Sequence, residues 1–259
     1  MKKSPAISST RAGRAETAHS GPAVSVVIAA KNEAEAIGPL LDEIEAVLDG
    51  REAYEIIVVD DGSTDTMLDV LAGVAVHQPH LRVIRHKKSC GQSAGVRTGI
   101  LAAEGRIIVT LDGDGQNDPA DIPGLLETYR AGAATGDLRM VAGQRVKRQD
   151  VWIKRVSSKI ANGVRSRLLR DSTPDTGCGL KVFDREAFLR LPWFDHMHRF
   201  LPALMLREGY AVVSAPVGHR PRSAGVSKYG TWDRLWVGIV DILGVAWLQS
   251  RAKRPEIIE

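Results

Sequence analysis

Apolar segments alternate with helix-like segments through the first half of the chain, and this alternation restricts the fold more than any other feature. The apolar segments are rich in aliphatic and β-branched residues typical of strands, and they span residues 24–30, 55–59, 81–86 and 106–111. Between them, three segments are helix-like, the first with apolar residues at three- and four-residue spacing: residues 37–48, 65–75 and 91–103. The pattern predicts an α/β fold with a mostly parallel, Rossmann-like sheet flanked by helices.

Polar clusters follow three of these predicted strands. Asn32 and Glu33 come after the first strand, Asp60 and Asp61 after the second, and residues 112–114 after the fourth. Ligands of parallel sheets bind beyond the carboxyl ends of the strands. Unpaired buried carboxylates are strongly disfavoured, so we expect these side chains to converge on one crevice. Turn and helix-capping roles are the alternative explanation.

The third cluster, residues 112–116 (DGDGQ), has the composition of a metal-binding turn, and we name it the metal-binding turn after this predicted role. Two carboxylates separated by one residue, with an amide close by, suit a hard divalent cation that prefers oxygen ligands. Such a cation can neutralise charge on a diphosphate. A helix–loop–helix calcium site would need a Glu at the twelfth position, where this chain has Pro123.

Several other classes of nucleotide-binding and metal-binding protein are disfavoured. The chain lacks the P-loop sequence, and its first strand is followed by Lys-Asn-Glu in place of the glycine-rich turn of dinucleotide-binding proteins. Its two cysteines, Cys90 and Cys178, lie far apart and form neither a disulfide framework nor a cysteine-spaced metal site. This usage favours a reducing compartment.

Several strings resemble those of the family 2 GT-A glycosyltransferases. The first strings are residues 26–33, 60–65 and 111–116 with Pro119. Later strings are similar to those of the polyprenyl-phosphate glycosyltransferases, the dolichol-phosphate mannose synthase group: residues 143–145, 175–181 and 222–229. Residues 90–94 look most similar to bacterial members that transfer galacturonate or formamido-arabinose. The resemblance covers residues 24–230 and implies a GT-A fold.

The resemblance also implies an activity: metal-dependent, inverting transfer of a sugar from a nucleotide-sugar to a polyprenyl phosphate. It favours a UDP-linked donor, and Mg²⁺ or Mn²⁺ as the cofactor. A lipid phosphate is already ionised near neutral pH, so this reaction needs no strong general base. The sequence does not specify the sugar, although a uronic acid would suit a basic pocket.

The resemblance assigns roles residue by residue. Donor contacts, with Asp60 on the pyrimidine, are expected from Ala30, Asn32, Glu33, Asp60, Asp61, Gly91, Gln92, Arg97, Gly113 and Lys228. The metal ligands are expected to be Asp112, Asp114 and Gln116, and the catalytic residues Asp112, Asp114 and Arg222. The acceptor phosphate is expected to contact Arg145, Arg155, Ser158, Lys159 and Ser227. The sequence departs from the family at Asn117, where His is frequent.

A basic segment at residues 152–170 has the pattern of an amphipathic helix. Its apolar stripe runs from Ile153 to Leu168, and between Arg145 and Arg170 the chain has nine Lys or Arg residues and one acid. This pattern is typical of a helix that lies in an anionic membrane interface, and a solvated surface helix is the alternative. Tryptophans in residues 231–259 favour the membrane. Few aromatics interleave the cations, which disfavours a nucleic acid.

These features predict the organisation of the chain. Residues 1–22 lack the apolar core of a signal peptide and form a disordered arm, residues 23–230 form the catalytic domain, and residues 231–259 form an interfacial helix and tail. No uninterrupted apolar run of about 18 residues occurs. We expect a peripheral or monotopic protein on the cytoplasmic face of the inner membrane. A homo-oligomer is compatible with the sequence.

Two other functions remain open at this stage. A GT-A enzyme that acts on a soluble sugar or a glycan would need a carboxylate base, for which Asp175 is available. A non-catalytic membrane-surface protein could keep a nucleotide-sugar fold. Such a protein would be expected to lose its metal ligands, and the chain retains Asp112, Asp114 and Gln116.

Overall fold

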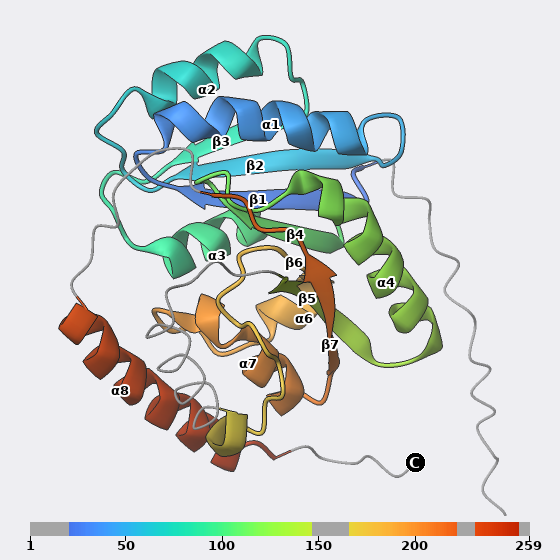
Figure 1. Cartoon of the computed structure of the whole chain (residues 1–259), viewed down its shortest axis with the longest axis vertical. Coiled ribbons are helices and arrows are strands. Elements are labelled where there is room, and N and C mark those ends of the chain that lie inside the picture. Colours follow the sequence, from blue (N-terminus) through green and yellow to red (C-terminus); the bar gives the residue numbers. More distant parts are fainter. Residues whose placement is uncertain (1–20, 147–165, 222–230, 254–259) are drawn as a thin grey trace, which may run out of the picture.

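The computed structural model describes residues 21–146, 166–221 and 231–253, and within these ranges the chain is organised around a seven-stranded sheet (Figure 1). The strand order is β3-β2-β1-β4-β6-β5-β7. Neighbouring strands are parallel except where β6 pairs with β4 and β5. The strands are β1 (Val24–Ala30), β2 (Tyr54–Asp60), β3 (Leu81–Arg85), β4 (Ile107–Asp112), β5 (Leu138–Arg145), β6 (Lys181–Asp184) and β7 (Ala211–Val217).

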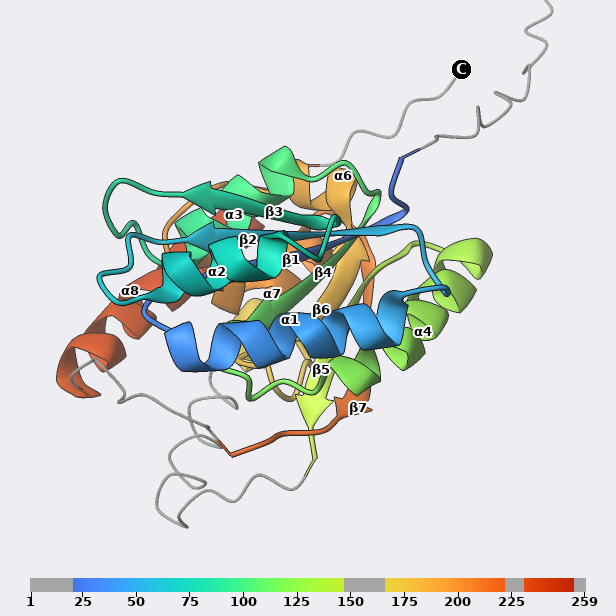
Figure 2. The same cartoon turned by 90° about the horizontal axis from the view of Figure 1, so that it is seen from above.

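Helices cover both faces of the sheet (Figure 2). Residues of one face pack in one apolar cluster with α1 (Ala34–Leu48), α2 (Met67–Ala75) and α4 (Ile122–Thr135). Residues of the other face pack in a second cluster with α3 (Gln92–Ala102), α6 (Arg185–Leu189), α7 (Leu201–Arg207) and α8 (Thr231–Ser250). Two short 3-10 helices are η1 (Pro119–Asp121) and η2 (Met197–Arg199). The predicted α/β fold with a mostly parallel sheet is confirmed.

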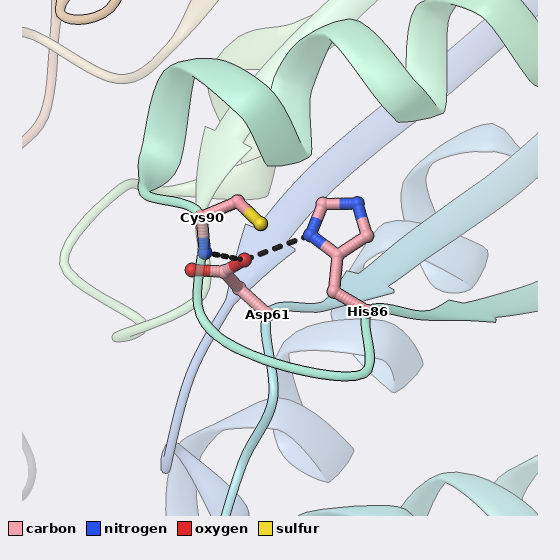
Figure 3. Close-up of side chains that lie close together, drawn as sticks. All are labelled: Asp61, His86 and Cys90. Carbon is pink, nitrogen blue, oxygen red and sulfur yellow. Dashed lines mark hydrogen bonds and ion pairs between the residues drawn. The ribbon is translucent and has the colours of Figure 1, made fainter.

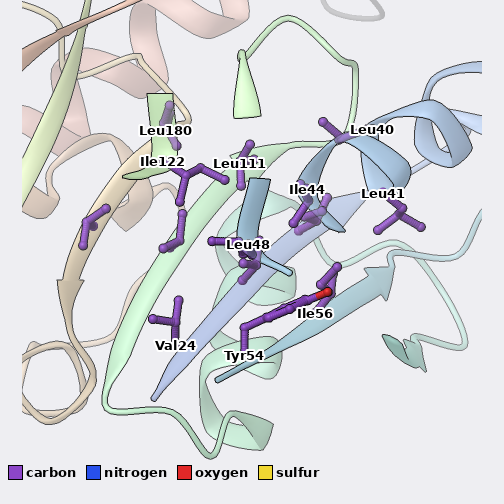
Figure 4. Packing of buried hydrophobic residues seen from close by; sticks show 14 of the residues in the cluster. Val24, Leu40, Leu41, Ile44, Leu48, Tyr54, Ile56, Leu111, Ile122 and Leu180 are labelled. Atoms are coloured by element: carbon purple, nitrogen blue, oxygen red, sulfur yellow. The ribbon is translucent and has the colours of Figure 1, made fainter. Parts of the chain in front are cut away.

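The packing of α1 explains why its sequence forms a helix. Leu40, Leu41, Ile44 and Leu48 lie on the side that faces the sheet and are almost completely buried (Figure 4). After the helix, Gly50 has a φ of 67°, a left-handed conformation that favours glycine and turns the chain toward β2. The strands beneath are buried on both faces, so their sequences are continuously apolar and do not alternate.

The register of the sheet brings the predicted polar clusters to the same edge. Ala30 pairs with Asp60, and Ala29 pairs with Asp112, so the carboxyl ends of β2, β1 and β4 are level. Because β6 runs in the opposite direction, its first residue, Lys181, lies at this edge beside Thr110. The expected convergence of the strand ends is therefore present, and it includes one residue from an antiparallel strand.

The helix α8 packs on α7 with one face only. Val245 is buried, and Gln249 Nε2 donates hydrogen bonds to the carbonyls of Leu169 and Ala203 at 2.8 and 3.3 Å. Val240, Leu243 and Trp247 are 54–59% exposed. In the parts of the chain that the structure describes, no helix is both long enough and apolar enough to span a membrane.

The helix predicted at residues 152–170 lies outside the described residues up to residue 165, as do the side chains of Trp232 and Trp236. The described end of that segment is helical at residues 166–169. There Leu169 is buried, whereas Leu168, which the predicted stripe includes, is 44% exposed.

Candidate functional site

The loops after β1 and β2 hold each other through hydrogen bonds. Asn32 has a φ of 56°, and its backbone N–H donates to Ser63 Oγ at 2.9 Å. Asn32 Oδ1 accepts a hydrogen bond from Thr64 N at 2.7 Å. Asp60 is fully buried, and its Oδ1 accepts from Ser63 N at 2.8 Å. Among the described residues, Asp60 Oδ2 accepts no hydrogen bond and lies 3.3 Å from Arg85 Nε.

Asp61 anchors the loop that joins β3 to α3 (Figure 3). Asp61 Oδ1 accepts from Cys90 N and lies beside His86 Nδ1, both at 2.8 Å. Asp61 Oδ2 accepts from Ser89 Oγ at 2.7 Å and from Gly91 N at 2.9 Å. Burial alone would raise the pKa of Asp61, but these four bonds outweigh it and lower the pKa.

The Asp61, His86 and Cys90 groups have the spacing of a metal cluster, since their ligand atoms lie within 4.8 Å of one another. The four donors already occupy both oxygens of the Asp61 carboxylate. The cluster is therefore explained as a loop anchor. The predicted contact of Asp61 with the nucleotide-sugar stays a prediction.

The anchored loop sets the position of the first residue of α3. Gly91, at a φ of 89°, precedes Gln92, whose Nε2 donates to Asp112 Oδ1 at 2.7 Å. Arg97, further along the same helix, stacks its guanidinium on the Trp193 ring at 5.1 Å. Gln92 therefore meets the metal-binding turn, while Arg97 is engaged with Trp193.

The metal-binding turn is held by its own backbone and by Asn117. Asn117 is buried, and its Oδ1 accepts from Asp112 N at 3.0 Å. Asp114 Oδ1 accepts from Gln116 N at 3.2 Å. A Cβ atom at Gly113 would come within 2.7 Å of Ala30, so the turn lies tightly against β1. The departure from the family at Asn117 thus has a structural role here.

The Asp112 carboxylate lies in an environment that favours a cation. Burial raises its pKa, and the neighbouring Asp114 raises it further, while Lys181 opposes the shift. Two crowded carboxylates of this kind gain most when a cation lies between them. The donor set of Asp112, Asp114 and Gln116 consists of oxygens that suit Mg²⁺ or Mn²⁺. These residues fit the predicted metal.

A second wall of the site comes from the turn that leads into β6. Thr110 Oγ1 donates to the carbonyl of Gly179 at 2.8 Å, which fastens this turn to β4. A side chain at Gly179 would collide with the Asp112 carboxylate. Lys181 is 4% exposed and donates through Nζ to the carbonyl of Cys178. Gly179 and Lys181 belong to a string that supported the family resemblance, but no individual role was predicted for either residue.

Arg145, the last residue of β5, and Asp175, in the segment that precedes β6, form a bidentate ion pair. Arg145 Nε and Nη2 donate to Asp175 Oδ2 and Oδ1 at 2.6 and 2.8 Å. The Arg145 backbone N–H also reaches Asp175 Oδ2, at 3.3 Å. The hydrogen bonds to Asp175 raise the pKa of Arg145. Each oxygen of the proposed alternative base is therefore occupied.

A cavity of about 270 Å³ opens beside Asp112. Its wall is formed by Gln92, Val96, Thr110, Leu111, Asp112, Thr176, Gly177, Cys178, Gly179, Lys181, His198, Arg199 and Leu201. Burial lowers the pKa of His198 to about 3, and its Nδ1 lies 2.7 Å from Ser93 Oγ. Sequence reasoning missed His198 and Arg199 because they lie far along the chain in a segment without a recognisable motif.

Arg220 ties the end of β7 to the metal-binding turn. Its backbone N–H donates to the Gln116 carbonyl at 3.0 Å, and its guanidinium bonds Glu43 at 2.6 Å and Asp118 at 2.7 Å. The chain therefore reaches residue 221 beside this turn. The predicted roles of six further residues stay predictions, because these residues lie outside the described ranges: Arg155, Ser158, Lys159, Arg222, Ser227 and Lys228.

The sequence matches the family described as Glycosyl transferase family 2 over residues 25–191, well over half of the chain. This chain belongs to glycosyl transferase family 2. The match includes the strand ends, the metal-binding turn and the Asp175–Arg145 pair. The predicted family is confirmed, and with it the class of enzyme.

Curated relatives share most of the sequence. The chain is 33% identical over 240 residues to dodecaprenyl-phosphate galacturonate synthase from Rhizobium johnstonii, covering 90% of this chain and 69% of the relative. It is 33% identical over 210 residues to undecaprenyl-phosphate 4-deoxy-4-formamido-L-arabinose transferase from Edwardsiella ictaluri, covering 80% of this chain and 63% of the relative. The chain thus spans about two thirds of the length of these relatives. Both names belong to the group that the sequence strings resemble.

Solved structures share the fold at lower identity. One is glucosyl-3-phosphoglycerate synthase from Mycobacterium tuberculosis in complex with Mn²⁺, UDP-glucose and phosphoglyceric acid, with a TM-score of 0.67, 19% identity and coverage of 90% of this chain and 81% of that one. Another is a mannosyltransferase from Pyrobaculum calidifontis in complex with GDP-Man and Mn²⁺, with a TM-score of 0.61, 22% identity and coverage of 92% and 66%. At these identities the likeness supports the fold alone.

Proposed function

We propose that this chain transfers a sugar from a UDP-sugar to the phosphate of a polyprenyl phosphate, with inversion at the anomeric carbon and with a bound Mg²⁺ or Mn²⁺. The main support is the convergence of Asp60, Asp112 and Asp114 on one edge of the sheet. The names of the curated relatives support the polyprenyl phosphate acceptor.

Asp60 is suited to bind the nucleotide base. Its Oδ2 is buried and accepts no hydrogen bond from the described residues, although Arg85 Nε lies 3.3 Å away. Leaving a buried acceptor unsatisfied costs about 1–3 kcal/mol, which a base N–H donor would recover. A pyrimidine such as uracil offers this donor. The loops that carry Asn32 and Ser63, which are held together by a hydrogen bond, would enclose the base.

Asp112, Asp114 and Gln116 would hold the cation at the end of β4, where it would neutralise charge on the leaving diphosphate. The chain itself contributes the orientation of these groups. Gln92 fixes one oxygen of Asp112, and Asn117 fixes its backbone. Such positioning lowers the barrier, because the groups need no rearrangement during the reaction.

In the proposed reaction, an oxygen of the lipid phosphate forms a bond to the anomeric carbon while the bond from that carbon to the diphosphate oxygen breaks. The attacking phosphate is already an anion, so the reaction needs no proton acceptor. The alternative, a soluble acceptor activated by Asp175, is disfavoured because Arg145 already occupies both Asp175 oxygens. The predicted contact of Arg145 with the acceptor phosphate remains part of this proposal.

An anionic membrane surface is the proposed location, at the cytoplasmic face of the inner membrane. The outer face of α8 presents Val240, Leu243 and Trp247 to solvent, and Arg251 lies 6.0 Å from the Trp247 ring. An apolar stripe that ends in a tryptophan and a cation suits the headgroup level of a bilayer. The acceptor would be presented at the same surface.

The proposal can be tested by incubating the purified protein and Mn²⁺ with a panel of nucleotide-sugars and undecaprenyl phosphate in detergent, with product mass as the readout. We expect a glycosyl undecaprenyl phosphate from at least one UDP-sugar. Transfer to free sugars or glycans, but not to the lipid phosphate, would favour the soluble-acceptor enzyme. Binding of nucleotide-sugars without transfer to any acceptor would favour a non-catalytic protein.

A further inference from the structure

The cavity beside Asp112 has an unusual balance of charge. Among the described residues of its wall, two cations, Lys181 and Arg199, face one carboxylate, Asp112. That carboxylate is a proposed metal ligand, so a bound divalent cation would take up its charge. Burial keeps His198 neutral near pH 7, because its pKa is lowered to about 3. The wall is therefore cationic without any contribution from its histidine.

The two cations differ in their availability. Lys181 is almost completely buried and donates to the Cys178 carbonyl. Arg199 is half-buried on η2, and within the described ranges its guanidinium makes no hydrogen bond or ion pair with another residue. Asp241 on α8 interacts with Arg199 through charge, but its side chain is paired with His196 at 3.1 Å. Arg199 is thus free to bind a ligand in the cavity.

The position of the cavity relates it to the donor. Its wall includes Asp112 of the metal-binding turn, where the diphosphate is proposed to lie, and Gln92, which donates a hydrogen bond to Asp112. The sugar is attached directly to that diphosphate, so a cavity next to the turn is within its reach. At about 270 Å³, the cavity is slightly smaller than the ~300–1,000 Å³ typical of sites for drug-sized ligands, which suits one monosaccharide.

We propose that this cavity is the donor-sugar pocket and that Arg199 selects a sugar that carries a carboxylate, the hexuronate class, with Lys181 adding to the positive potential. A guanidinium binds a carboxylate through two parallel hydrogen bonds, a geometry that a neutral hydroxymethyl group cannot reproduce. The inference rests on the proposed function, because it takes the diphosphate to lie at the metal-binding turn.

The test is the affinity of the full chain, with Mn²⁺, for UDP, UDP-glucose, UDP-galactose, UDP-glucuronate and UDP-galacturonate by titration calorimetry. We expect at least one uronate to bind about 10-fold more tightly than its neutral counterpart, as for a charge-assisted hydrogen bond of about 1.5 kcal/mol. Arg199→Gln should abolish this preference while UDP itself still binds. Arg199→Lys should keep part of it, since it retains charge without the two-pronged geometry.

Arg51→Gln is the matched control, since Arg51 is exposed in the loop between α1 and β2, at the opposite edge of the sheet. It should keep the uronate preference. Equal affinity for uronates and neutral donors, with UDP still bound, would overturn this inference alone. If Arg199→Gln raised only the Michaelis constant for undecaprenyl phosphate, Arg199 would be assigned to the acceptor phosphate, and the inference would also be overturned. Failure of UDP itself to bind would instead contradict the proposed function.

Discussion

At the scale of single residues, the proximity of the Asp112 and Asp114 carboxylates is unfavourable without a bound cation and favourable with one. Without a cation, burial and mutual repulsion raise the pKa of Asp112, and the Gln92 amide and the Lys181 charge offset part of this cost. With a cation between them, the same proximity becomes favourable. A divalent cation bound by these residues would therefore relieve an electrostatic strain that the site has without it.

Asp114→Ala is expected to reduce transfer below detection, a loss on the order of 10³-fold or more, because it removes a proposed ligand of the charge-neutralising metal. The measurement is product formation from a UDP-sugar and undecaprenyl phosphate over a range of Mn²⁺ concentrations. Asp69→Ala, an exposed acid on α2, is the control and should retain activity. Wild-type activity in Asp114→Ala would contradict the metal assignment.

His198 is expected to make stability depend on pH in the weakly acidic range. Its pKa is about 3 in the folded protein, against 6.5 for an unperturbed histidine, so the unfolded chain binds a proton first as the pH falls. Its contribution is therefore fully present above pH 6.5 and is lost as the pH falls from 6.5 toward 3, by about 1 kcal/mol between pH 6.5 and 5.5. Urea unfolding across this range should show the loss in wild type and in the exposed control His77→Gln, but not in His198→Gln. Parallel curves for wild type and His198→Gln would refute the assignment.

At the scale of elements, two connections shape the site. The turn into β6 presses its backbone against the Asp112 carboxylate, and the loop into α3 is held by Asp61 so that Gln92 meets the same carboxylate. Neither connection is a catalytic element in itself. Together they hold one carboxylate from two sides.

Gly179→Ala is expected to lower kcat/KM on the order of 100-fold, because the added methyl group would displace the Asp112 carboxylate or the turn. The affinity for undecaprenyl phosphate should change far less. Gly124→Ala on α4, where a Cβ atom meets open space, is the matched control. Unchanged kinetics in Gly179→Ala would show that the turn does not fix Asp112.

Asp61→Asn is expected to destabilise the protein by about 2–3 kcal/mol at pH 7, because the amide cannot accept all four hydrogen bonds. The pKa of Asp61 is lowered on folding, so its ionisation stabilises the fold above pH 3.8 and the benefit is lost as the pH falls below that value. Urea unfolding at pH 7 measures the difference. An unfolding free energy equal to that of the exposed control Asp69→Asn would refute the anchoring role.

At the scale of the whole molecule, the sheet separates two apolar clusters that serve different purposes. One cluster, under α1, α2 and α4, supports the side of the edge that is proposed to bind the nucleotide. The other, under α3 and α7, also carries α8 with its exposed outer face (Figure 1). The proposed membrane surface is thus attached to the body that carries the cavity wall.

Leu243→Glu is expected to weaken binding to vesicles that contain anionic phosphatidylglycerol by about 10-fold, since it replaces the proposed apolar contact with the bilayer by a charge that the anionic surface repels. Cosedimentation measures the bound fraction, and added salt should weaken wild-type binding. The fold should be unaffected because Leu243 is 59% exposed. Val76→Glu, at an 87% exposed position after α2, is the control. Equal binding by Leu243→Glu and wild type would exclude α8 as the contact.

The bounds of the first strands and helices could be predicted because local physical rules decide them. A strand buried on both faces must be continuously apolar, and α1 must repeat its apolar residues at helical spacing, as residues 40, 41, 44 and 48 do. The strand-end rule likewise placed Asp60 and Asp112 on one edge without knowledge of the register. The resemblance then predicted their chemistry.

By itself, the sequence determined the α/β fold, the acidic edge and the Asp112-Gly113-Asp114 turn, because each depends on residues that are close along the chain. Only the tertiary structure decided what surrounds that turn. Lys181 reaches it from an antiparallel strand, and Arg199 reaches the adjoining cavity from a segment more than 80 residues further along. These contacts depend on strand order and helix packing, which no local pattern encodes, and the charge of the proposed sugar pocket arises from them.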